Sequence, residues 1–270
     1  MSTGGSDDRR APVLTVNRSA VGLGLAAFLI MGVVGWIGGM PRAAELRSSS
    51  GTVVTGEQQD AGVPTSSVRQ LGGAGQVSSA ASALPPLDPA WTAEVAAATG
   101  IPSRALEAYA GAALATSIEN PECGLGWNTL AAIGFVESAH GTIGGGTLDA
   151  SGLPSTRIIG VPLDGISAAS IPDSDAGTID GDTTVDRAVG PMQFIPDSWK
   201  RHGVDASGDG VADPNQIDDA ALTAARYLCV AGGNLATAEG WNTAVLAYNA
   251  DPAYVAQTSA KADAYAVAAQ

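Results

Sequence analysis

One long uncharged run divides this chain and restricts where its folded part can lie. No residue from Ser19 to Pro41 is charged, and this run of 23 residues contains the apolar stretch AAFLIMGVVGWIGGM. A hydrophobic stretch of about 20 residues is long enough to cross a bilayer as a helix. Because Arg9, Arg10 and Arg18 precede the run, the positive-inside rule keeps residues 1–18 in the cytoplasm and places the remainder outside.

We interpret residues 19–41 as a retained transmembrane signal anchor, and a cleaved signal peptide is the alternative. The apolar core of a signal peptide is usually only about 7–15 residues long and is followed by a small-residue cleavage site. The uncharged run is longer than that, and PRAAEL after it contains no clear A-x-A site. With either interpretation the bulk of the chain is extracytoplasmic, in a membrane-anchored or a secreted protein of the cell envelope.

After this run we predict a flexible linker over residues 42–86 and one folded domain over residues 87–270. The linker stretch is rich in Ser, Gly, Thr, Val and Gln and contains no aromatic residue, which is typical of a tether. From Leu87 onward, Ala-rich segments with helix start and stop signals recur. We expect helices within residues 88–100, 101–121, 127–138, 191–203, 217–232, 240–249 and 252–268, with the piece at 191–203 broken by Pro196.

A Gly/Asp-rich segment over residues 141–186 interrupts the predicted helices. It contains one short apolar run around Ile158 and has no helical period, so we expect a long irregular loop. A loop of this length inside a compact domain is usually functional. The fold class predicted from the sequence is therefore a mainly α domain with a long irregular loop, preceded by a transmembrane helix and a disordered tether.

Charge and cysteine content narrow the function classes. The formal net charge is −14, which disfavours nucleic-acid binding because that relies on Lys and Arg against phosphate. The two cysteines are Cys123 and Cys229. An even count in an exported chain predicts a disulfide between them, and two buried free thiols are the alternative.

Glu137 ends the otherwise apolar stretch AAIGFVES. In a helix, residues three, four and seven apart share a face, which places Glu137 with Ile133 and Leu130, where a core residue should point. Desolvation there would raise the pKa of the carboxyl, which is one way to make a general acid. The alternative is a glutamate at a helix end that bends out to water.

Three short stretches occur in a fixed order: FVESAHG, then GPMQFIPDSW, then LAYNA. Each is weak alone, but the ordered set resembles the lytic transglycosylases, lysozyme-like enzymes that cut bacterial peptidoglycan. The form GPMQFIPDSW followed by VDASGDGVADPNQIDDA is most similar to the membrane-bound transglycosylase B type. The resemblance covers about residues 88–265, and it implies a lysozyme-like helical fold.

The resemblance also implies roles for individual residues. Glu137, in the E-S signature, would be the sole catalytic acid and base, and no cofactor would be required for catalysis. The groups that line the sugar cleft would come from Ser138, from the G-x-M-Q turn and from A-Y-N, which here are Gly190, Met192, Gln193, Tyr248 and Asn249. His140 could touch the rim of this cleft, although structural packing is the preferred role for it.

The resemblance implies cleavage of the β-1,4 bond between MurNAc and GlcNAc in glycan strands, with formation of 1,6-anhydro-MurNAc. The alternatives are a muramidase of the same fold that uses water, and a non-catalytic cell-wall-binding module. A muramidase would require a second carboxylate near Glu137, and seven aspartates of the long loop are candidates. We expect these aspartates to be solvated or to organise the loop; they are Asp149, Asp164, Asp173, Asp175, Asp180, Asp182 and Asp186.

The stretch from Asp205 to Asp219 fits the start of an EF-hand calcium loop. The ligand positions would be Asp205, Ser207, Asp209, the Val211 carbonyl and Asp213. Position 12 is Gln216 in place of the usual Glu, and Asp218 and Asp219 come too late for the standard loop. The sequence therefore predicts a structural calcium site of low affinity, and an acidic turn before the next helix is the alternative.

Overall fold

The computed structural model describes residues 84–166 and 169–270. The predicted cytoplasmic tail, the predicted anchor and most of the predicted linker lie outside these residues. Within the described part of the chain, no helix is both long and apolar enough to cross a membrane. Leu84 already packs against the core beside Gly111, so the ordered contacts begin slightly before residue 87, where the domain was expected to start.

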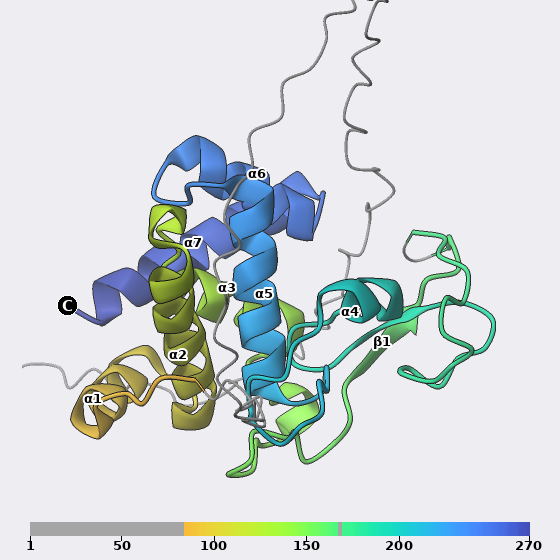
Figure 1. Ribbon diagram of the computed structural model, residues 1–270, viewed down its shortest axis with the longest axis horizontal. Coiled ribbons are helices and arrows are strands. Elements are labelled where there is room, and N and C mark those ends of the chain that lie inside the picture. The colour runs from red at the N-terminus through yellow and green to blue at the C-terminus, as the bar shows by residue number, and fades with distance from the viewer. Residues whose placement is uncertain (1–83, 167–168) are drawn as a thin grey trace, which may run out of the picture.

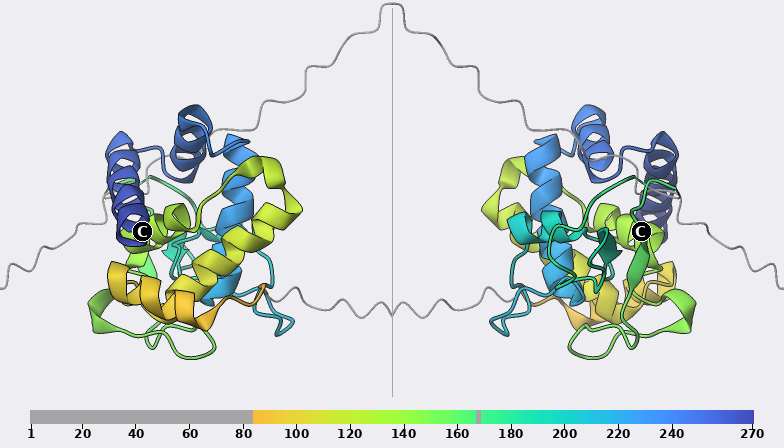
Figure 2. Two further views of the ribbon diagram at one scale, coloured as in Figure 1. Left: turned by 90° about the vertical axis from the view of Figure 1, so that its left-hand side faces the viewer. Right: turned by 90° about the vertical axis from the view of Figure 1, so that its right-hand side faces the viewer.

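The described residues form a mainly helical domain, which fits the lysozyme-like fold class predicted from the sequence. The helices are α1 (Pro89–Thr99), α2 (Ser103–Glu119), α3 (Trp127–Ser138), α4 (Pro196–His202), α5 (Ile217–Gly232), α6 (Ala238–Tyr248) and α7 (Pro252–Ala268), with short 3₁₀ turns at η1 (Pro121–Cys123) and η2 (Ile143–Gly145). Figure 1 shows α1 and α2 on one side of α5 and the segment with β1 and α4 on the other. Figure 2 shows α1 and α6 at opposite ends of the molecule.

Two helices run through the core and are buried nearly all round. In α3, eight residues are buried, among them Leu130, Ile133 and Glu137. In α5 the residues from Ile217 to Ala225 are all buried. Helices buried to this extent are stable only where neighbours surround them, and here α2, α6 and α7 provide that cover.

The helix ends follow the signals in the sequence. Asp88 caps α1 by accepting a hydrogen bond from the backbone N–H of Ala90, and Gly100 ends the helix in the left-handed conformation. In α7 the buried residues recur at helical spacing, and this stripe faces α3. Its members are Tyr254, Thr258, Ala262 and Tyr265.

Two expectations about local structure were wrong. The long loop is not wholly irregular, because β1 (Ile159–Pro162) pairs antiparallel with β2 (Arg187–Val189). The apolar run near Ile158 forms strand β1, although the sequence there shows no periodic pattern that would have predicted a strand. Pro196 does not break a helical piece but begins α4, because proline fits the first turn of a helix, where its missing N–H leaves no partner unsatisfied.

The predicted disulfide is present between Cys123 and Cys229, which are 106 positions apart in sequence. It joins η1, just before α3, to the last turn of α5. Leu235 also donates its backbone N–H to the Cys123 carbonyl at 2.6 Å. The ends of three segments are therefore held together at this point of the fold.

Candidate active site

Glu137 lies in the last turn of α3, on the face that packs into the core. Leu130 and Ile133 on the same face are fully buried, and Glu137 is 8% exposed. Burial raises the pKa of the Glu137 carboxyl to about 7, because the carboxylate loses its hydration there. The expectation that Glu137 points where a core residue should point is confirmed, and the alternative of a glutamate bent out to water is not.

Tyr254 provides the hydrogen bond that holds this carboxyl group. Its hydroxyl, in the first turn of α7, donates to Glu137 Oε1 at 2.7 Å. Burial and the charge of Glu137 raise the pKa of Tyr254, so the hydroxyl stays protonated and remains a donor. Among the described residues, Glu137 Oε2 has no hydrogen-bond partner, which leaves this oxygen for proton exchange with a bound molecule.

Tyr254 was not among the site residues predicted from the sequence. The signal that could have identified it is the stripe of α7, in which Tyr254 is the first buried residue. A buried tyrosine usually places its hydroxyl against a polar partner. The position of that partner depends on how α7 lies against α3, and a single sequence does not reveal this.

The turn from Gly190 to Gln193 is held in an unusual backbone conformation. Gly190 has φ of 79°, and a Cβ there would lie 1.8 Å from the Pro214 carbonyl oxygen, so only glycine fits. Gln193 has φ of 50°, and its Nε2 donates to the Gly190 carbonyl at 2.9 Å. Gln193 is 8% exposed, and its Oε1 lies close to Gly160 of β1.

Hydrogen bonds join the three stretches at this turn. The Ser138 hydroxyl donates to the Pro191 carbonyl at 2.6 Å. The Tyr248 hydroxyl donates to the Met192 carbonyl at 2.7 Å. The residues that resemble a transglycosylase signature, far apart in sequence, are therefore brought together around the end of α3.

The remaining predicted cleft residues occupy different positions around this centre. Ser138 and Met192 are almost completely buried and bind protein partners, so they shape the turn. Tyr248 packs its ring on Phe194, and the charge of Glu137 contributes to raising its pKa after the larger effect of burial. Asn249 is 8% exposed and accepts the backbone N–H of Asp251 through Oδ1. Direct contact of these residues with a sugar stays a prediction.

No aspartate of the long loop acts on Glu137. Burial and the hydrogen bond from Tyr254 are the two influences on the Glu137 pKa, and no second carboxylate of the described residues contributes. The loop aspartates accept hydrogen bonds from their own segment; for example, Asp186 binds the N–H and the hydroxyl of Ser174. Asp173, Asp175 and Asp186 bring carboxylate oxygens within 4.8 Å of one another, a grouping that was not predicted from the sequence.

The loop predicted to bind calcium is closed by Asp219, which the sequence analysis placed too late in the loop. Asp219 is fully buried, and its carboxylate accepts the backbone N–H groups of Ala206, Ser207 and Asp213 at 2.8–2.9 Å. Asp205 accepts the N–H groups of Gly208 and Gly210. Within the described residues, Asp205, Asp209 and Asp213 do not form a trio of close carboxylates, and calcium binding by this loop stays a prediction.

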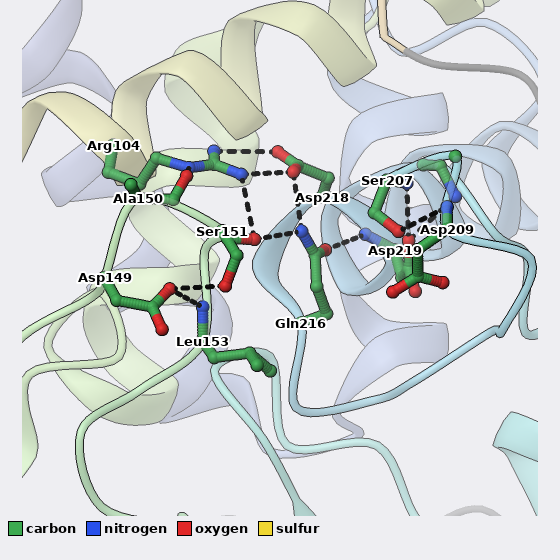
Figure 3. A network of polar contacts seen from close by, with 12 residues as sticks. Arg104, Asp149, Ala150, Ser151, Leu153, Ser207, Asp209, Gln216, Asp218 and Asp219 are labelled. Carbon is green, nitrogen blue, oxygen red and sulfur yellow. Dashed lines mark hydrogen bonds and ion pairs between the residues drawn. The ribbon is translucent and has the colours of Figure 1, made fainter.

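Figure 3 shows where the side chain at position 12 of this loop goes. Gln216 Nε2 donates to the Ser151 carbonyl and to Asp218, and its Oε1 accepts the N–H of Asp219. Asp218 in turn forms an ion pair with Arg104 of α2. Gln216 therefore caps α5 and joins α2 to the long loop, and it does not turn toward the side chains that were predicted to bind the ion.

Comparison with known proteins agrees with the resemblance but covers only part of the chain. Neither the curated proteins nor the solved structures give a match. Residues 179–268 match the family model described as a Transglycosylase SLT domain. The matched range contains Gln193, Tyr248 and Tyr254 and does not reach Glu137. This match supports a lytic transglycosylase that acts on peptidoglycan, and thus an extracytoplasmic protein.

Proposed function

We propose that this protein is a lytic transglycosylase that cleaves the β-1,4 bond between MurNAc and GlcNAc and forms 1,6-anhydro-MurNAc. The observation that carries the proposal is the buried carboxyl group of Glu137, which has a pKa raised to about 7 and one oxygen without a hydrogen-bond partner among the described residues. A group with this pKa is present in both protonation states near neutral pH and serves as acid and as base. The family match to residues 179–268 supplies the substrate class.

In the first half of the reaction, Glu137 transfers its proton from Oε2 to the oxygen that bridges the two sugars. The C1–O bond breaks, GlcNAc leaves as the alcohol, and positive charge develops at C1 of MurNAc. The 2-acetamido group of the substrate can stabilise this charge. Tyr254 keeps its hydrogen bond to Oε1 and stabilises the carboxylate that the proton transfer creates, since hydrogen bonds to a charged acceptor are the stronger ones.

In the second half, the MurNAc C6 hydroxyl attacks C1 and loses its proton to the Glu137 carboxylate. The C6–O–C1 bond closes the anhydro ring, and Glu137 regains the proton that it gave. No water is consumed, so one carboxyl group suffices. A hydrolase of the usual kind needs two carboxyl groups, about 5–5.5 Å or about 6.5–9.5 Å apart. The lack of a second carboxylate acting on Glu137 among the described residues favours the transglycosylase over a muramidase.

Two finer parts of the proposal rest on the sequence. GPMQFIPDSW and the segment after it favour the membrane-bound B type. The uncharged run over residues 19–41 favours attachment to the membrane with the N-terminus in the cytoplasm.

Digestion of purified peptidoglycan in water enriched in ¹⁸O, followed by mass spectrometry, tests the proposed reaction. We expect anhydro-muropeptides that carry no ¹⁸O. Reducing muropeptides labelled with ¹⁸O would instead show a muramidase, and the absence of any product would leave a binding module. Glu137→Gln keeps the shape of the side chain but has no transferable proton, so we expect a loss of about 10²–10⁴-fold. Asp164→Asn, in the long loop, is the matched control that should keep full activity.

A further inference from the structure

The turn that follows Glu137 has a backbone conformation that needs support. Ala139, His140 and Gly141 have φ values of 50°, 64° and 79°. Two of the three are not glycine, and a non-glycine residue held in a sparsely populated region costs on the order of 1–3 kcal/mol unless its surroundings fix it. Backbone hydrogen bonds from Ala139 and His140 back to Phe135 and Gly134 close the turn.

The side chain of His140 ties this turn to α7 and lies close to α2. Its Nε2 lies 2.8 Å from the Tyr265 hydroxyl, and its Nδ1 lies 3.4 Å from the Tyr109 hydroxyl. His140 is 5% exposed, so the contact with Tyr265 is made away from water. The short distance to Tyr265 identifies α7 as the main partner of the turn.

His140 remains uncharged in these surroundings. Burial and the nearby Lys261 lower the pKa of His140 to about 4. Lys261 Nζ itself lies 3.7 Å from the centre of the Phe135 ring, on the same side of α3. The titratable groups that face His140 are thus Tyr109 from α2 and Tyr265 and Lys261 from α7. A neutral imidazole has one donor and one acceptor nitrogen, which suits a single well-formed bond to a tyrosine hydroxyl.

Helix α7 is therefore bound to the end of α3 at two points. Tyr254 binds Glu137, and Tyr265 binds His140, three residues further along. Both tyrosines belong to the buried stripe of α7 and are about 16 Å apart along its axis at 1.5 Å per residue. Asn128 Nδ2 also donates to the Ala262 carbonyl at 3.1 Å near the start of α3, so the bonds from Tyr254 and Tyr265 act together with this bond to set the register of α7 at the end of α3 that carries Glu137.

We propose that His140 is a positioning residue for Glu137: its bond to Tyr265 holds α7 so that the Tyr254 hydroxyl meets Glu137 Oε1. This inference rests on the proposed function of Glu137 as the acid. It assigns to His140 a role beyond packing, because the geometry of the reacting carboxyl group depends on it. The groups that face Glu137 are Tyr254 of α7 and Tyr248 of α6.

Tyr265→Phe tests the proposal, because it removes one hydroxyl and keeps the ring. The hydrogen bond from Tyr254 lowers the Glu137 pKa, so weakening that bond should raise it. Complete loss of a hydrogen bond to a charged group shifts a pKa by about 1 unit or more, and we expect about half a unit in Tyr265→Phe. His140→Asn, which tolerates the left-handed conformation, should act in the same direction. NMR titration of the Glu137 carboxyl carbon measures the shift without any turnover.

A double-mutant cycle separates positioning from general stability. In a Tyr254→Phe background, Tyr265→Phe should shift the Glu137 pKa no further, because the bond through which it acts is already absent. Tyr227→Phe is the matched control, since it removes a hydroxyl that binds the Ala247 carbonyl at 2.9 Å and should leave the pKa unchanged. In active enzyme, Tyr265→Phe should also lower kcat with KM within about twofold.

Two results would overturn the proposal. One is an unchanged Glu137 pKa in Tyr265→Phe and His140→Asn, with only a lower melting temperature, which would make the His140 contact purely structural. The other is additive pKa shifts in the double mutant, which would mean that Tyr265 does not act through Tyr254. If the wild type releases no anhydro product, the proposed function fails, while the titration still decides the positioning role.

Discussion

At the scale of single residues, the burial of Glu137 that prepares it for proton transfer also opposes folding. The pKa of Glu137 is about 7 in the folded protein against an ordinary value of 4.5. The folded state therefore binds the proton more tightly than the unfolded state does, and stability falls as the pH rises from about 4.5 to 7. Above pH 7 the full cost of a buried carboxylate is present, eased by the single bond from Tyr254.

Glu137→Gln should consequently stabilise the fold at high pH while it removes activity. At 1.36 kcal/mol per pKa unit, the gain in the free energy of unfolding at pH 8 is at most about 3 kcal/mol, and it should vanish near pH 4. Urea denaturation of both proteins at pH 4, 6 and 8 measures the difference. A difference that does not change with pH would show that Glu137 is not a buried titrating group.

At the scale of elements, the sequence predicted the boundaries of helices better than it predicted which elements contact one another. Trp127–Ser138 and Pro252–Ala268 were expected with the boundaries that the structure has, because caps, prolines and glycines act within a few residues. The pairing of β1 with β2 joins Pro162 to Arg187 and Ile159 to Val189, which lie 25 and 30 residues apart in sequence, and no local signal reports it. The same holds in the site: Glu137 was found from the pattern of its own helix, whereas Tyr254 and His140 depend on how α7 docks.

Asp219 illustrates how an element can be fixed by a residue outside its motif. Its carboxylate binds three backbone N–H groups of the preceding loop and is fully buried. Asp219→Asn replaces one acceptor oxygen by a donor, so at least one buried N–H loses its partner, at a cost of about 1–3 kcal/mol. Asp209→Asn, whose exposed side chain caps a single N–H, should cost about 0.5 kcal/mol or less. Equal losses in urea denaturation would contradict this role of Asp219.

Calcium binding by the loop from Asp205 to Asp213 remains a proposal, and the arrangement of the loop limits it. Position 12 of the loop is Gln216, whose side chain binds the Ser151 carbonyl and Asp218. No bidentate carboxylate therefore completes the site, and the affinity for calcium should be weak, with a dissociation constant of about 10⁻⁴–10⁻³ M. An ion at tenfold its dissociation constant stabilises by only about 1.4 kcal/mol. We expect a small rise in melting temperature with millimolar calcium, absent in Asp205→Ala/Asp209→Ala. The same response in both proteins would show an acidic turn without a metal.

At the scale of the whole molecule, the uncharged run over residues 19–41 decides where the domain works. If this run is a retained anchor, the full chain should stay with the membrane after high-salt and carbonate washes, because a spanning helix holds through apolar burial and not through charge. N-terminal analysis of the protein from cells should then find residues 1–18 still attached. A soluble form that begins after residue 41 would establish the cleaved signal peptide instead.

The disulfide is the other feature that acts on the whole domain. Cys123 and Cys229 are 106 positions apart, and closing a loop of that length removes entropy from the unfolded chain worth about 4–5 kcal/mol in the chain-entropy model. Because the bridge mainly restrains the unfolded state and lies at the start of α3, remote from Glu137 at its end, its loss should reduce stability and leave the chemistry intact.

We therefore expect Cys123→Ala/Cys229→Ala to lose about 2–5 kcal/mol and to keep the wild-type kcat well below its melting temperature. Reduction of the wild type should reproduce the loss and have no effect on the double variant. A fall in kcat at a temperature where the variant remains folded would mean that the bridge also holds the active site, with the hydrogen bond from Leu235 to Cys123 insufficient to keep the start of α3 in place.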